Sequence, residues 1–132
     1  MSKSQRWSVN ETVILIYFSS RQVRCKALRC LLARRGFYRS PRAIKHRAYT
    51  LAKSHPELKV NGDFWDLDTV DNWIDNIAGD HRSVNELIWF GEKDARDVMK
   101  NQPIESLHGV FEWFDFRMSS VRAFPREQKR DG

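Results

Sequence analysis

Three observations predict an all-α fold with a well-formed core. Apolar residues recur at three- and four-residue steps in successive segments, which is the spacing of one helix face. Ser and Asp stand where helices would begin, and Gly or Pro stands where they would end. The hydrophobic fraction is 41%, with five Trp and eight Phe, so the 132 residues suit one domain or two small ones. We expect a trihelical bundle in residues 1–60, extended by further short helices.

The first helix is expected to follow a polar N-terminal arm. Ser8 and Glu11 form the S-x-x-E pattern of a capping box, in which each side chain accepts a hydrogen bond from a backbone N–H of the first turn. The β-branched residues of TVILIYFSS would also suit a strand. The capping box and the spacing of Trp7, Leu15 and Phe18 favour a helix, with Leu15 and Phe18 pointing inward.

A second helix is expected from about Arg21 to Arg34, with Ser19 or Ser20 as its cap. Gly36 stands where a left-handed C-terminal cap is needed. The polar face of this helix is basic, and it carries Arg21, Arg24, Lys26, Arg29, Arg34 and Arg35.

Residues 39–55 carry the most informative helix. Ser40 can cap its start, and Pro41 then occupies the first helical position, where its missing N–H costs nothing. His55 precedes a proline, which ends the helix. The predicted buried stripe is Ile44, Ala48 and Leu51. The outward positions carry cations and two rings but no acid, and they are Arg42, Lys45, His46, Tyr49 and Lys53.

The two halves of the chain differ in charge. Residues 1–60 hold 14 Lys and Arg against two acids, for a net charge of +12, whereas residues 61–132 hold nine against 15, for a net charge of −6. Charge can segregate on solvated helices without a binding role. An imbalance of this size favours a nucleic-acid-facing half joined to something else.

Residues 6–55 resemble a Myb/SANT-like helix-turn-helix domain of the fungal type, which is homeodomain-like in fold. The resemblance is carried by W-S-x-x-E from Trp7 to Glu11, Leu15, the run from Ala27 to Leu32, Gly36, and R-S-x-x-A-I-x-x-R-A-x-x-L from Arg39 to Leu51. A typical Myb repeat has three evenly spaced tryptophans, of which only Trp7 remains, so the resemblance does not extend to a standard Myb target site.

The resemblance implies that the third helix reads the major groove of double-stranded DNA. The predicted DNA-binding residues are Arg39, Arg42, Lys45, His46, Tyr49 and Lys53, together with Arg34 and Arg35. His46 and Tyr49 among the cations can contact base edges or a thymine methyl, which a merely solubilising face would not need. We therefore expect a nuclear, DNA-binding or chromatin-associated protein that regulates transcription and is not an enzyme.

The acidic half, residues 61–118, is expected to add short helices. One begins at Asp66 or Asp68 and ends at Gly79, and a second capping box is expected at Ser83 and Glu86. A following short helix would end at Gly91. An aromatic terminal element offers the protein-binding candidates Phe111, Trp113, Phe114 and Phe116. This element either completes the core or docks onto a partner protein. Residues 119–132 are expected to form a basic flexible tail.

The pattern does not favour an enzyme, a cofactor or a metal site. The four histidines do not share ligand spacing with Cys, Asp or Glu, and there is no glycine-rich phosphate loop. No apolar run approaches the roughly 20 residues of a membrane span. The competing function is a SANT-type adaptor that binds chromatin or transcription-complex proteins through the acidic helices and residues 110–116. A further hypothesis is that the acidic half folds back and screens the basic helix.

Overall fold

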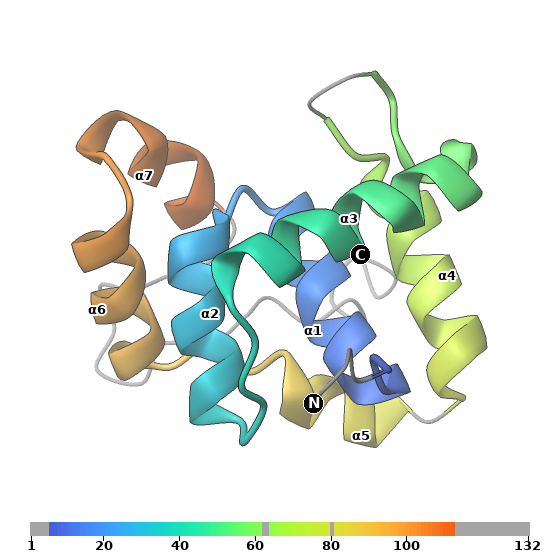
Figure 1. Ribbon diagram of the computed structural model, residues 1–132, viewed down its shortest axis with the longest axis horizontal. Helices are drawn as coiled ribbons and strands as arrows, with labels where there is room; N and C mark the ends of the chain where they lie inside the picture. Colours follow the sequence, from blue (N-terminus) through green and yellow to red (C-terminus); the bar gives the residue numbers. More distant parts are fainter. Residues whose placement is uncertain (1–5, 62–63, 80, 113–132) are drawn as a thin grey trace.

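The computed structural model describes residues 6–61, 64–79 and 81–112, and within these ranges the fold is helical (Figure 1). The elements are α1 (Val9–Ser20), α2 (Cys25–Arg34), α3 (Pro41–Ser54), the 3-10 turn η1 (Pro56–Leu58), α4 (Leu67–Ala78), α5 (His81–Leu87), α6 (Glu92–Asn101) and α7 (Ile104–Phe111). The described residues contain no β-strand, only one isolated antiparallel bridge between Lys59 and Trp65. The predicted all-α class is confirmed.

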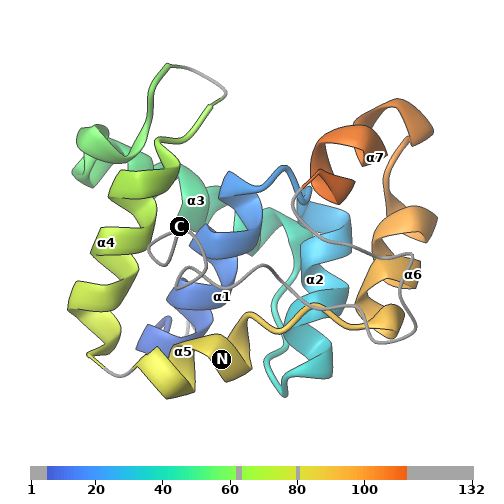
Figure 2. The same ribbon diagram turned by 180° about the vertical axis from the view of Figure 1, so that it is seen from behind.

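Helix α1 is the central element. It lies between α2 and α4 in both views, and α3 and α5 also pack on it (Figures 1 and 2). Every residue from Val13 to Phe18 is at most 1% exposed. A helix that is apolar on all sides is stable only when neighbours cover all of it. Leu15 and Phe18 point inward as predicted, and the remaining residues of this run are buried as well because α4 and α5 cover the other side of α1.

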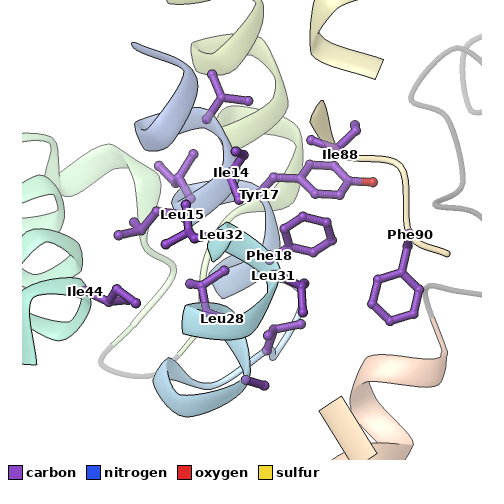
Figure 3. Packing of buried hydrophobic residues seen from close by; sticks show 14 of the residues in the cluster. Ile14, Leu15, Tyr17, Phe18, Leu28, Leu31, Leu32, Ile44, Ile88 and Phe90 are labelled. Atoms are coloured by element: carbon purple, nitrogen blue, oxygen red, sulfur yellow. The ribbon is translucent and has the colours of Figure 1, made fainter. Parts of the chain in front are cut away.

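One hydrophobic core spans both halves of the chain. Figure 3 shows Phe18 of α1 among Leu28 and Leu31 of α2, with Phe90 from the segment after α5 nearby. The rings of Phe18 and Phe90 are 6.1 Å apart. The segments on the two sides of the boundary predicted at residue 60 therefore contribute to the same core. On the far side of α2 the layer is completed by α6, followed by α7.

The second helix begins at Cys25, so the predicted start at Arg21 is wrong. Helix α1 continues to Ser20, and the chain then turns through Gln22 in a left-handed conformation, φ 78°. The N–H of Val23 donates to the carbonyl of Phe18 at 3.0 Å, which closes this turn. The serines expected to cap α2 are thus the last residues of α1.

Arg21 is consequently a buried residue rather than part of the basic face of α2. Its Nη2 donates to both carboxylate oxygens of Asp71 in α4, at 3.1 and 3.0 Å. The side chains of Arg21 and Asp71 are only 3% and 8% exposed. The guanidinium also stacks on the ring of Tyr17, 4.0 Å from its centroid. This ion pair joins α1 to α4 inside the molecule.

The predicted cap at Ser8 and Glu11 is confirmed with both of its hydrogen bonds, and Asp66 caps α4. Gly79 ends α4 in the left-handed region at φ 73°, as expected. The capping box expected at Ser83 is wrong, because α5 already begins at His81. Gly91 is the N-cap residue of α6 and does not end α5, which stops at Leu87; its N–H donates to the carboxylate of Asp94 at 3.0 Å.

The aromatic terminal element is described only in part. Phe111 is the last residue of α7 and packs half-buried against the core. Trp113, Phe114 and Phe116 lie outside the described residues, as does the basic tail predicted at 119–132.

Candidate nucleic-acid interface

Helix α3 forms where the local signals place it. The hydroxyl of Ser40 accepts a hydrogen bond from the N–H of Ala43 at 3.1 Å, and Pro41 is the first helical residue. The helix ends at Ser54, before His55 and the proline that follows. Its predicted inner stripe is confirmed, with Ile44 and Leu51 buried and Ala48 half-buried against the core. The outward direction of the α3 side chains opposite this stripe follows from this packing.

The outer face of α3 consists of the side chains predicted from the sequence. Arg42, Lys45, His46, Tyr49 and Lys53 are all exposed. Tyr49 is 62% exposed, and the ammonium of Lys53 lies 5.8 Å from its ring centroid. We call these five residues the α3 outer face.

The α3 outer face keeps its positive charge. Helix α3 contains no Asp or Glu in its 14 residues. Among the described residues, no carboxylate forms an ion pair with Arg42, Lys45 or Lys53. Helix α3 lies on one side of the molecule, in front of α1 in Figure 1 and behind it in Figure 2. Within the part of the chain that the structure describes, the face is therefore a cationic surface without an acid partner, and it includes the rings of His46 and Tyr49.

Arg39, the predicted DNA-binding residue just before α3, forms an ion pair with α1 inside the molecule. Its Nε and Nη2 donate to the two carboxylate oxygens of Glu11 at 2.6 and 3.0 Å, and its guanidinium stacks on Trp7, 4.6 Å from the ring centroid. The hydrogen bond to Glu11 raises the pKa of Arg39. Burial raises the pKa of Glu11, but the hydrogen bonds from Arg39 and Ser8 outweigh it and hold that pKa below its usual value.

Arg34 and Arg35, at the end of α2, also meet acids of the chain itself. Arg34 donates from Nε to Asp97 at 2.6 Å, and this hydrogen bond raises the pKa of Arg34. Arg35 donates to both oxygens of Asp94 at 3.1 and 3.0 Å, and also to the backbone carbonyls of Leu87 and Trp89. These pairs join α2 to the segment from α5 to α6. Of the eight predicted DNA-binding residues, three thus have intramolecular acid partners and five form the α3 outer face.

Three described acids of the second half pair with arginines outside the α3 outer face. Asp71 pairs with Arg21, and Asp94 and Asp97 pair with α2, so the acidic half meets the basic half through α1 and α2. The screening hypothesis expected acids over the basic helix. In the part of the chain that the structure describes, no such pair is formed with the outer-face cations.

Arg47 is a further cation of α3 to which the sequence pattern assigned no role. This residue is half-buried on the flank of α3 that faces α1, where its Nη2 lies 3.4 Å from the hydroxyl of Thr12. It was assigned neither to the apolar stripe nor to the outward set. The available signal was its position, since it adjoins the buried stripe and yet carries a permanent charge.

The described residues include no group of three or more His, Cys, Asp and Glu that could hold a metal ion. None of the described helices is long and apolar enough to cross a membrane. No family model, no curated protein and no solved structure matches the chain.

Proposed function

We propose that the chain binds double-stranded DNA through the α3 outer face, as a nuclear regulator of transcription or a chromatin-associated protein. In this proposal α1, α2 and α3 form a Myb/SANT-like trihelical unit, and the later helices complete its core. The supporting observation is the exposure of three cations and two rings on one side of α3, with no acid partner among the described residues.

The chemistry of the face suits a groove with phosphates on both sides. An α-helix fits the major groove of B-form DNA, which is about 12 Å wide. Arg42, Lys45 and Lys53 can neutralise phosphates or donate to guanine, while Tyr49 and His46 can contact base edges or a thymine methyl. If the three Lys and Arg residues each meet one phosphate, the logarithm of the binding constant falls with that of the salt concentration with a slope of about −2.7.

The test measures binding of the full chain to random duplex DNA by fluorescence anisotropy over a series of salt concentrations. Arg42→Gln and Lys45→Gln should each weaken binding and reduce the salt slope by about 0.9. Tyr49→Ala should weaken binding with little change in slope, because it removes no charge. The matched control is Arg96→Gln, which removes one cation from an exposed site on α6. Equal affinity in all four variants would refute the proposal.

The second candidate is the protein adaptor. It is favoured by exposed large apolar side chains in the acidic half, namely Trp89, Met99 and Ile104, the last of which is 82% exposed. Single exposed apolar residues are common on protein surfaces. This observation therefore supports the adaptor function less strongly than the exposed cations of the α3 outer face support DNA binding. An adaptor would leave duplex binding unaffected by Arg42→Gln and would bind its partner less well after Ile104→Ser.

A further inference from the structure

Among the described arginines that are at least half-buried, Arg47 is the one without a carboxylate partner. Four arginines with described side chains are not exposed: Arg21, Arg35, Arg39 and Arg47. Each of the first three donates to both oxygens of a carboxylate. Within the described ranges, the one hydrogen-bond partner of Arg47 is the hydroxyl of Thr12, at 3.4 Å. Its Nε is buried and meets no hydrogen-bond acceptor among the described residues.

This arrangement is unfavourable for the protein on its own. A guanidinium stays charged at any physiological pH, so it cannot avoid the cost of burying a charge by losing a proton. Withdrawing a charge from water is costly unless an opposite charge or hydrogen bonds replace the water. The hydroxyl of Thr12 is neutral and distant. The described part of the chain therefore leaves the Arg47 guanidinium without an anionic partner.

The position of Arg47 indicates which anion this is. It follows His46 of the α3 outer face by one residue, or about 100° around the helix axis, on the flank toward α1. Lys45 precedes His46 by one residue and so lies on the opposite flank, toward α2. Burial raises the pKa of the Cys25 thiol of α2, and the charge of Lys45 partly offsets this rise. A helix in the major groove has a sugar-phosphate strand on each side. With α3 in the major groove, Arg47 on one flank and Lys45 on the other would each lie toward one of the two strands.

We propose that Arg47 is a phosphate-binding residue, which contacts the DNA strand on the α1 side of α3 while Lys45 contacts the strand on the α2 side. The inference rests on the DNA-binding function proposed above for the identity of its ligand. A guanidinium can contact a phosphate through two parallel N–H groups, and the partial exposure of the Arg47 side chain leaves it accessible from the flank. The contact contributes affinity for any sequence rather than for one target.

The experiment compares Arg47→Gln with the control Arg96→Gln, since both remove one positive charge from the full chain. With random duplex DNA, Arg47→Gln should reduce the salt slope by about 0.9, which at 0.1 M salt corresponds to about eightfold weaker binding. Arg96→Gln should leave the slope unchanged. Arg47→Lys keeps a cation at the flank and should restore most of the slope. If Arg47→Gln binds like the control while Arg42→Gln weakens binding, the Arg47 inference is wrong and the proposed function stands.

Thermal melts separate the two proposals if duplex DNA does not bind at all. Inorganic phosphate should then raise the Tm of the wild-type chain and of Arg96→Gln more than that of Arg47→Gln, which would preserve the anion site without DNA. An equal response in all three overturns it. A large drop in the Tm of Arg47→Gln without phosphate would also overturn it, because the guanidinium would then stabilise the fold rather than await a ligand.

Discussion

The buried ion pair between Arg21 and Asp71 provides the sharpest test of how the chain is held together. We expect Asp71→Ala to lower the free energy of unfolding by about 3–5 kcal/mol, because it leaves the Arg21 guanidinium buried without its carboxylate. The two side chains are 3% and 8% exposed, so water cannot replace the lost partner. Small domains are stable by about 5–15 kcal/mol, so the loss is a large part of the total.

The assay is urea unfolding followed by circular dichroism and by tryptophan fluorescence. With a slope of about 2 kcal/mol per molar urea, a loss of about 4 kcal/mol moves the midpoint down by about 2 M. Both probes should shift together, because the pair joins α1 to α4 within one core.

The double variant Arg21→Met, Asp71→Leu separates the charge from the packing. Replacing both partners of a buried pair with apolar residues is often neutral or stabilising, so the double variant should be more stable than Asp71→Ala. A loss below about 1 kcal/mol for Asp71→Ala would refute the reasoning. So would a double variant at least as unstable as the single one.

Three further predictions concern pH and helix ends. The folded-state pKa of Glu11 lies below the ordinary value of 4.5, so its contribution to stability is present above that pH and is lost as the pH falls through the folded pKa. Acid titration of Tm should show this loss in the wild-type chain and a smaller one in Glu11→Gln. Ser40→Ala should cost about 1 kcal/mol in urea unfolding by removing the cap of α3, whereas Ser40→Asn should retain most of it. Gly79→Ala should cost about 1 kcal/mol by the same assay, because φ is 73° there, although a Cβ would meet nothing within 4 Å. No loss in either Ser40→Ala or Gly79→Ala would contradict the corresponding cap geometry.

Local signals predicted the features that depend on local structure. The caps at Ser8, Ser40 and Asp66 were readable because a side chain and the N–H it binds lie three residues apart. The inner stripe of α3 was readable for the same reason, since its spacing follows the helical repeat.

The roles of four arginines depend on acids that are distant in the sequence, so the local pattern did not predict them. Arg21 was placed on a solvated face, but its partner Asp71 is 50 residues away. Arg34, Arg35 and Arg39 likewise meet acids 28 to 63 residues away, so their internal roles leave no trace in the local pattern. The same holds for α1, because its uniform apolar surface did not show which helices would cover each of its sides.

The central position of α1 has a consequence for how this chain is made. Synthesis produces Val13–Phe18 before the segments that enclose it, and α5 and the core residue Val98 come more than 60 residues later. Until then a run of six β-prone, uncharged side chains is open to other chains, which is the composition associated with aggregation. The nascent protein therefore needs either rapid completion or a chaperone on that run, and overexpression should favour inclusion bodies.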